Sequence, residues 1–198
     1  MEVWNMKKLT VGFLLAVLFA CFLTGPLAAA TLPAVGGQLP DFTLPAPKDS
    51  ADKSYLGVSG LLFSGPFKIP QIKASVVIVE IFSMYCPYCQ AEAPKVNRLF
   101  SKIESNPALK GKIKLLGIGV GNSDYEVGVF KKKYNVTFPL FSDGDFKLYK
   151  LLGEPRTPYF IGVRINPDGS HRIFYSKLGA FEGVDAFLDQ IVKLSGLK

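Results

Sequence analysis

Two cysteines separated by two residues are the first feature of this sequence that could carry out chemistry. Cys86 and Cys89 enclose Pro87 and Tyr88, and Cys21 is the only other cysteine. A pair at this spacing can be a redox-active dithiol, half of a metal site, a haem attachment or two ordinary buried thiols. A disulfide between them would close too short a loop to add much stability. A purely structural bridge is therefore a poor explanation for the pair.

Haem attachment and zinc binding both need residues that the sequence does not place near this pair. Covalent haem attachment uses CxxCH, but Gln90 follows Cys89 here. A structural zinc ion needs four ligands, and the single histidine, His171, stands far from the pair in the sequence. We therefore predict no metal ion and no organic cofactor.

The elements predicted around the pair favour dithiol chemistry over two inert thiols. Residues 75–82 form an apolar, β-branched run, which predicts a strand buried on both faces, and residues 87–105 predict a helix. Cys86 then lies at the helix N-terminus, where free N–H groups and the helix dipole favour a thiolate. Cys89 lies one turn further along. Because disulfide exchange needs an exposed attacking thiolate and a sheltered resolving thiol, we assign attack to Cys86 and resolution to Cys89.

One acidic residue interrupts the apolar strand. Glu80 is the only charged residue in the stretch VVIVEIF. A buried carboxylate is costly unless it is paired or protonated, and its even spacing from Cys86 would place it on the helix side of the sheet. There it could accept the proton of Cys89 during resolution. The alternative is a carboxylate at the sheet edge that faces solvent.

A threonine–proline step precedes a later strand. Thr157 and Pro158 stand directly before the apolar residues 159–164. The peptide bond between them could be cis, a rare and specific feature, and the backbone of Thr157 could then pair with an extended substrate. The residues alone leave open an ordinary trans proline that begins the strand.

The rest of the pattern predicts an α/β protein whose central mixed β-sheet is flanked by helices on both faces. Residues 48–73 stay ambiguous between a hairpin and a surface loop with an apolar patch. The further strands are predicted at 112–120, 159–164 and 170–178, with a turn at 166–169, and the further helices at 123–134, 145–152 and 181–195.

Residues 1–30 have the pattern of a secretory signal peptide. Two lysines precede a long uncharged run, and the alanines that end this segment permit cleavage after Ala30. Without cleavage, residues 9–30 would be long enough to anchor the chain in a membrane. Cys21 also lies in a sequence that resembles a bacterial lipobox. All three alternatives predict an exported chain that is periplasmic, or anchored in the membrane and facing the periplasm.

The charge pattern argues against a nucleic-acid partner. The formal net charge is +7, which could favour acidic partners or anionic lipid. However, the longest basic cluster is the three lysines at 131–133, and we interpret it as the solvated face of a helix. No dense basic run with interleaved aromatic residues is present in the sequence.

These features together resemble the thioredoxin superfamily, most closely the exported TlpA-like thiol–disulfide oxidoreductases, which belong with the redoxin and AhpC/TSA proteins. The resemblance runs from about residue 36 to 194 and implies a thioredoxin-like fold with a cis Pro158. It rests on three segments, QLPDFTLPAP at 38–47, VVIVEIFSMYCPYCQAEAP at 76–94 and RTPYFIGV at 156–163. It also implies a domain plan: an extended lead-in at 31–74, with an addition at 55–67 that is atypical of the family, and a core at 75–198.

The resemblance also implies roles for residues and partners. A redox-active Cys86–Cys89 disulfide would form in each cycle, and Glu80 stands where thioredoxins carry a buried acid. The expected substrates are exported proteins with cysteines, and the expected electron partner is a membrane-bound donor or acceptor. We expect a reductase, although the intervening Pro-Tyr is glutaredoxin-like and Tyr85 replaces the usual tryptophan. The residues expected to contact substrate are Tyr85, Pro87, Tyr88, Thr157 and Pro158.

Two other functions remain as alternatives. A peroxiredoxin shares the fold, but its motif has a threonine three residues before the cysteine and a proline seven before; Ser83 and Val79 stand at these positions. The second alternative is a redox-silent module that grips extended polypeptide with Phe82, the two tyrosines beside the cysteines and the apolar 55–67 stretch.

Overall fold

The computed structural model describes residues 31–58 and 65–197. The predicted signal peptide, including Cys21, and the middle of the 55–67 stretch lie outside these residues. No helix within the two ranges is both long enough and apolar enough to cross a membrane.

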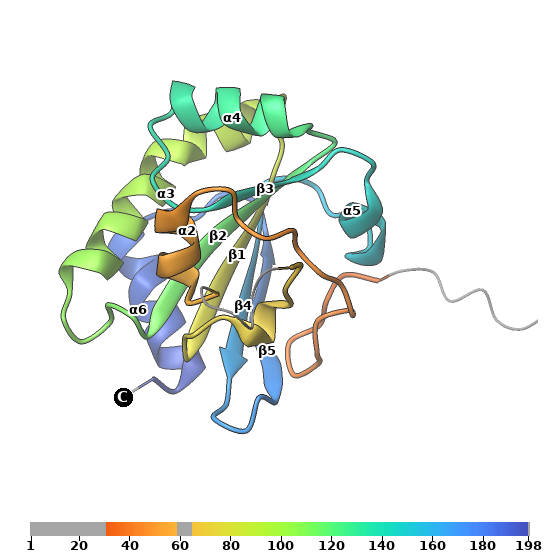
Figure 1. Ribbon diagram of the computed structural model, residues 1–198. Coiled ribbons are helices and arrows are strands. Elements are labelled where there is room, and N and C mark those ends of the chain that lie inside the picture. Colours follow the sequence, from red (N-terminus) through yellow and green to blue (C-terminus); the bar gives the residue numbers. More distant parts are fainter. Residues whose placement is uncertain (1–30, 59–64, 198) are drawn as a thin grey trace, which may run out of the picture.

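A five-stranded mixed sheet forms the centre of the molecule, with the strand order β3-β2-β1-β4-β5 (Figure 1). β1 pairs in parallel with β2, which pairs in parallel with β3, whereas β4 runs antiparallel to both β1 and β5. The predicted α/β class with a mixed sheet is thus confirmed. The strand bounds are β1 Val76–Phe82, β2 Ile113–Val120, β3 Leu140–Asp143, β4 Tyr159–Ile165 and β5 His171–Leu178.

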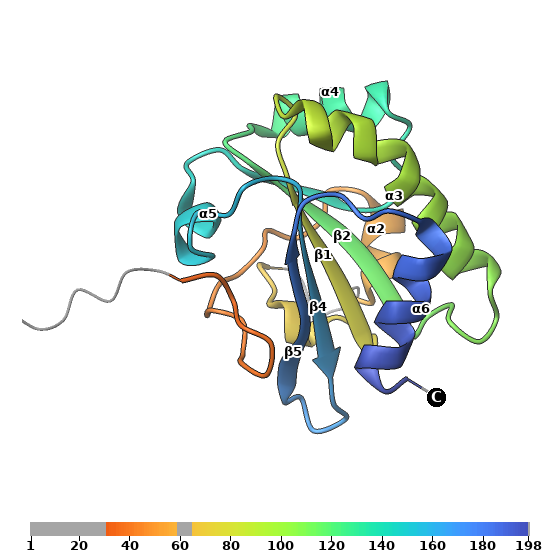
Figure 2. The same ribbon diagram turned by 180° about the vertical axis from the view of Figure 1, so that it is seen from behind.

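Helices cover both faces of this sheet. α3 and α6 lie against one face, which Figure 2 shows from the front, and α2 lies on the opposite face, in front of the sheet in Figure 1. α4 packs with α3, and α5 follows β3. The helix bounds are α2 Ser50–Leu56, α3 Pro87–Ser105, α4 Asp124–Lys133, α5 Lys147–Leu151 and α6 Val184–Ser195, with a 3-10 turn, η2, at Ile69–Gln71.

Two hydrophobic cores follow from the alternation of side chains along β1. Val76, Ile78 and Phe82 belong to the core under α3 and α6, whereas Val77 and Val79 belong to the core under the lead-in. Every residue of β1 is buried, as the unbroken apolar run predicts for a strand covered on both faces. Because successive side chains point to opposite faces, Glu80 faces the α3 side.

The structure describes residues 48–58 and 65–73 of the segment that the sequence left ambiguous. Residues 50–56 form α2, whose N-cap is Asp49, and Leu56, Val58 and Phe67 are buried in the core under the lead-in. Residues 59–64, the middle of the apolar stretch at 55–67, lie outside the described residues, so the choice between a hairpin and a surface loop with an apolar patch stays a prediction. The sequence SADKSYL buries only Leu56, so the helix carries no apolar periodicity that could have predicted it.

One strand of the sheet was missing from the sequence-based prediction. β3 has four residues, LFSD, and its side chains alternate between half-buried and buried. A strand this short, with Ser142 and Asp143 in its second half, has too few residues to show a period of two. Pairing with β2 stabilises it in the fold.

Candidate active site

Cys86 lies at the junction that the sequence predicted, between the end of β1 and the start of α3. It is the N-cap residue of α3, and Pro87 occupies the first turn, where a missing N–H costs nothing. The half-buried Sγ donates a hydrogen bond to the backbone oxygen of Thr157 at 3.3 Å. Burial alone would raise the pKa of this thiol, but hydrogen bonds to its sulfur from the Thr157 side chain, from Cys89 and from the Tyr88 backbone outweigh it, so its pKa is lowered.

Cys89 has the opposite environment. It is fully buried in the core beneath α3, and burial raises the pKa of its thiol to about 12. A hydrogen bond joins the two cysteine side chains, and both cysteines are free thiols. The structure thus shows one accessible thiol with a lowered pKa beside a sheltered thiol that holds its proton.

Glu80 is buried rather than exposed at the sheet edge, with only 3% of its surface accessible. Burial, reinforced by the nearby charge of Glu92, raises the pKa of its carboxyl to about 8. This carboxyl is therefore mostly protonated at neutral pH. No hydrogen bond joins Glu80 to either cysteine in the described parts of the chain.

Glu92 is a second buried acid that the sequence reasoning missed. It lies on α3, accepts a hydrogen bond from the N–H of Phe181 at 3.0 Å and pairs with Lys95 at 3.0 Å. The spacing of three residues from Cys89 gives it the same inward-facing side of the helix. A carboxylate on the apolar side of an amphipathic helix was the signal that could have revealed it.

The loop before β4 lies against Cys86. The Thr157–Pro158 peptide bond is cis, and the backbone oxygen of Pro158 accepts a hydrogen bond from Gly179 at 2.7 Å. Pro158 is buried and Thr157 is half-buried. The fold thus brings Thr157, 71 positions away in the sequence, next to the sulfur of Cys86.

Two amides hold the loop between β1 and Cys86, and the sequence analysis assigned neither of them a role. The side-chain oxygen of Asn122 accepts a hydrogen bond from the N–H of Met84 at 2.8 Å. The side-chain nitrogen of Gln90 donates to the oxygen of the same residue at 2.7 Å. Since Asn122 is fully buried, its amide is a fixed support for the backbone that leads into Cys86.

Two tyrosines stand at the rim of the site. Tyr85 and Tyr88 expose 64% and 73% of their surface, so both rings are accessible from solvent. The hydroxyl of Tyr85 also hydrogen-bonds to the carboxylate of Glu126 on α4. This contact connects the rim of the site to the start of α4.

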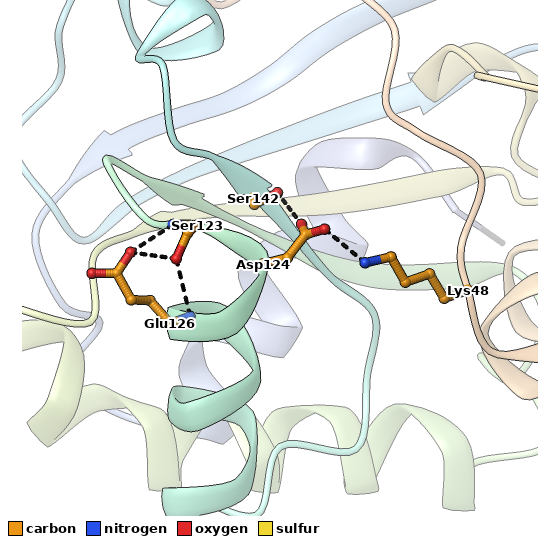
Figure 3. A network of polar contacts seen from close by, with 5 residues as sticks. All are labelled: Lys48, Ser123, Asp124, Glu126 and Ser142. Carbon is orange, nitrogen blue, oxygen red and sulfur yellow. Dashed lines mark hydrogen bonds and ion pairs between the residues drawn. The ribbon is translucent and has the colours of Figure 1, made fainter.

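The start of α4 is itself ordered by polar contacts. Ser123 and Glu126 form a capping box, in which each side chain bonds the backbone N–H of the other (Figure 3). Beside them, Asp124 bonds Ser142 of β3 and pairs with Lys48 of the lead-in at 2.7 Å. α4 is therefore tied to both the sheet and the lead-in, which fixes the position of the carboxylate that contacts Tyr85.

Comparison with known proteins finds a family model that matches most of this chain. The model of the AhpC/TSA family matches residues 35–170. The secreted antigen MPT53 of Mycobacterium tuberculosis, described as soluble, is 24% identical over 115 residues, which are 58% of this chain and 62% of that protein. The match thus spans less than two thirds of this relative.

Several solved structures share the fold at low sequence identity. A secreted disulfide oxidoreductase of Mycobacterium tuberculosis, homologous to DsbE of Escherichia coli, is 20% identical with a TM-score of 0.52 over 77% of this chain and 95% of its own. StoA of Bacillus subtilis is 20% identical, with a TM-score of 0.52 over 76% of this chain and 96% of its own. The thioredoxin domain of a thiol–disulfide oxidoreductase from Bacteroides vulgatus is 12% identical, with a TM-score of 0.54 over 80% of this chain and 98% of its own. These likenesses confirm the thioredoxin-like fold.

Proposed function

We propose that this chain, which belongs to the AhpC/TSA family, is a thiol–disulfide oxidoreductase that exchanges disulfides with cysteine-containing proteins through Cys86 and Cys89. The observation that carries the proposal is the contrast between the two thiols. Cys86 is accessible and has a lowered pKa, whereas Cys89 is buried and has a raised one. Thiol–disulfide exchange needs this division between an attacking thiolate and a resolving thiol.

The reaction runs in two steps when the protein acts as a reductant. The Cys86 thiolate attacks one sulfur of the substrate disulfide, and the other substrate sulfur leaves with the bonding electrons and takes up a proton. Cys89 then loses its proton and attacks the Cys86 sulfur, which releases the second substrate thiol and leaves a Cys86–Cys89 disulfide. Two electrons pass to the substrate, and an external dithiol must return them.

The surrounding residues support these steps. Thr157 presents its backbone beside Cys86, where an extended substrate could pair with it, and Pro158 fixes this loop. Tyr85, Pro87 and Tyr88 form the rim on which the substrate would lie. We propose that Glu80 accepts the proton of Cys89 during resolution. Because no hydrogen bond links Glu80 to Cys89, the proton transfer needs an intervening water or a small movement.

The direction of exchange and the compartment belong to the same proposal. We propose a reductase that is exported and works in or facing the periplasm, supplied with electrons by a membrane-bound partner. The signal pattern of residues 1–30, which lie outside the described residues, supports export, as does the secreted mycobacterial relative. Mass spectrometry of the chain from cells distinguishes cleavage after Ala30 from an intact anchor and from lipidation at Cys21.

The reduction potential of the full chain, equilibrated in thiol buffers, tests the proposal. A two-electron couple near about −270 mV supports a reductase, whereas a value near about −120 mV would make the protein an oxidant. Cys89→Ser should accumulate a mixed disulfide with substrate, and Cys86→Ser should form none. The absence of any reversible couple would overturn the proposal in favour of the redox-silent module, and peroxide consumption without exchange would favour the peroxidase.

The role of Glu80 has its own test. The rate at which Cys89 resolves a preformed mixed disulfide should rise as the pH passes about 8, because only ionised Glu80 can accept the proton. Glu80→Gln should slow this step, on the order of tenfold or more, and remove that inflection. If the rate and its pH profile from 6 to 9 are the same in both proteins, Glu80 has no part in proton transfer.

A further inference from the structure

A hollow of about 360 Å³ opens directly beside the reactive cysteine. Thr157, whose backbone oxygen accepts the hydrogen bond from Cys86, is one of its lining residues, and Tyr85 is another. The volume lies near the lower end of ligand pockets, roughly 300–1,000 Å³, which suits one or two side chains. The hollow is therefore continuous with the place where a substrate disulfide would react.

The far wall of this hollow is aromatic. Phe146 and Tyr149 line it, with their rings in edge-to-face contact at 5.8 Å between centroids. Phe146 exposes 44% of its surface. A large exposed ring in a concave site is a feature of surfaces that bind apolar groups.

The aromatic wall is held in place by the end of β3. The backbone oxygen of Asp143 accepts hydrogen bonds from the N–H groups of Gly121 and Phe146, and its buried carboxylate accepts from the N–H of Tyr149 at 2.8 Å. A Cβ atom at Gly121 would lie 2.4 Å from the Phe146 ring, so the ring packs directly over that glycine. The wall is thus built before any substrate arrives, which lowers the entropic cost of binding.

A single charged residue lines the hollow. Arg156, at its edge, is exposed and takes part in no ion pair or hydrogen bond within the described ranges. The acidic group that contacts the rim, Glu126, is already bonded to Tyr85 and Ser123. An unpaired guanidinium beside an apolar hollow is complementary to a carboxylate, which it can bind in bidentate fashion.

We propose that this hollow is a specificity pocket that selects extended polypeptide substrates with an aromatic or large aliphatic side chain, and a carboxylate, close to their reactive cysteine. The apolar side chain packs against Phe146 and Tyr149 while the carboxylate pairs with Arg156. This inference rests on the proposed function, since it names the substrate class of the same site.

Short activated peptides test the pocket. Each carries one cysteine linked by a disulfide to 5-thio-2-nitrobenzoate. Cys86 attacks the peptide sulfur, the aromatic thiolate leaves with the bonding electrons because its pKa is low, and Cys89 then releases the peptide thiol. The coloured thiolate reports the rate of the first step. In the reference peptide, glycine surrounds the cysteine. In the other peptides, phenylalanine occupies one flanking position at a time, and aspartate or lysine stands next to the phenylalanine.

For the reduced full chain, phenylalanine in at least one position should raise the second-order rate constant about tenfold, consistent with burial of much of the ring. At low salt, peptides with aspartate beside the phenylalanine should react about threefold faster than those with lysine, which is the range of an exposed ion pair. This difference in rate constant should be smaller at high salt. Phe146→Ala should lose most of the phenylalanine effect, and Arg156→Glu should reverse the preference for aspartate over lysine.

Two matched variants serve as controls. Lys150→Glu makes the same charge change as Arg156→Glu, but on α5 and outside the pocket lining. Leu151→Ala, also on α5, removes an exposed apolar side chain as Phe146→Ala does. Both control variants should keep the peptide preferences of the wild type. Equal rates for all peptides would overturn the pocket and leave the proposed function standing. Rates no faster than those of Cys86→Ser would overturn the proposed function itself.

Discussion

At the residue scale, position along one helix turn decides the chemistry of two identical side chains. Cys86 is the N-cap residue of α3, where the backbone of Tyr88 and Cys89 favours its thiolate, whereas Cys89 is buried in the core. The first environment favours a thiolate and the second opposes it. The chemistry proposed for this site therefore depends on a difference that the helix creates, since the two cysteines themselves are the same.

This difference predicts the reactivity of each thiol. Alkylation of Cys86 by iodoacetamide should follow a single ionisation with a midpoint below that of an ordinary thiol, roughly 8.5, because its pKa is lowered. The measurement is the alkylation rate from pH 5 to 10. In Cys86→Ser, Cys89 should react slowly across the same range. A midpoint at or above that of a free thiol would contradict the assignment of Cys86 as the attacker.

Glu80 should make stability depend on pH. Its carboxyl has a pKa of about 8 in the fold against 4.5 in a free side chain, so between these values the folded state holds a proton that the unfolded state has lost. The free energy of unfolding should then fall as the pH rises from 5 to 8. Glu80→Gln should lack this fall and be more stable than wild type at pH 8 by a few kcal/mol.

Chemical denaturation at pH 5 and pH 8 measures this effect. Glu182→Gln, which removes an exposed carboxylate from the same molecule, is the matched control and should follow wild type. A parallel pH dependence in wild type and Glu80→Gln would mean that Glu80 is ionised in the fold, and the raised pKa would be wrong.

At the scale of elements, the loop between β1 and α3 is positioned from outside its own sequence. Asn122, which follows β2, binds the N–H of Met84, and Gln90 on α3 binds its oxygen. A loop held at both backbone groups presents Cys86 in one place. Parallel pairing of β1 and β2 brings the ends of both strands to the same edge of the sheet, which is why Asn122 can reach this loop.

Removing the two amides should therefore have unequal effects. Asn122→Ala leaves the N–H of Met84 without a partner, which we expect to cost about 1–3 kcal/mol of unfolding free energy. Gln90→Ala should cost less because water can reach the half-buried oxygen. Denaturation curves, with hydrogen exchange at the amide of Met84, give the comparison. Equal losses, or no faster exchange in Asn122→Ala, would contradict this account of the loop.

At the scale of the whole molecule, the lead-in is part of the folded body. Gly36 donates to the oxygen of Ile173 and Ile173 donates to the oxygen of Gly37, both at 2.8 Å. These bonds cover part of the outer edge of β5, where unpaired backbone groups would otherwise invite aggregation. Further along, Leu44 forms a bridge with Phe67 and is buried in the core under the lead-in.

Gly153 tests whether the start of the lead-in docks where the structure places it. A Cβ atom there would lie 2.6 Å from the backbone carbon of Thr31, whereas Gly169, with a similar positive φ, has open space around it. Both alanine variants should lose about 1 kcal/mol or more through backbone strain, but only Gly153→Ala should also release the lead-in.

Denaturation and hydrogen exchange of the first lead-in residues measure this difference. Faster exchange at Leu32 in Gly153→Ala, and not in Gly169→Ala, is the expected result. The same exchange rate in both variants would show that Thr31 does not pack against Gly153.

The sequence by itself determined the local features of this protein. The buried run of β1, the helix that begins after Cys86 and the cap at Ser123 all follow from contacts between residues close in the chain, so their bounds could be predicted to within one or two residues. The same locality explains why the cysteine pair could be recognised. The weakly patterned α2 and β3 escaped prediction because other elements stabilise them.

The tertiary structure alone decided which distant groups meet. It buried Glu80 near Glu92, brought Asn122 to the loop before Cys86, and gathered the pocket lining from four segments, at residues 83 and 85, 120 and 121, 146 and 149, and 155–157. Burial and proximity set pKa values and binding surfaces, and both depend on how strands pair across the sheet. A pattern of neighbouring residues carries no direct record of that pairing, which is why the position of the cysteine pair at the start of α3 could be predicted, whereas the contacts of Asn122 and Glu92 could not.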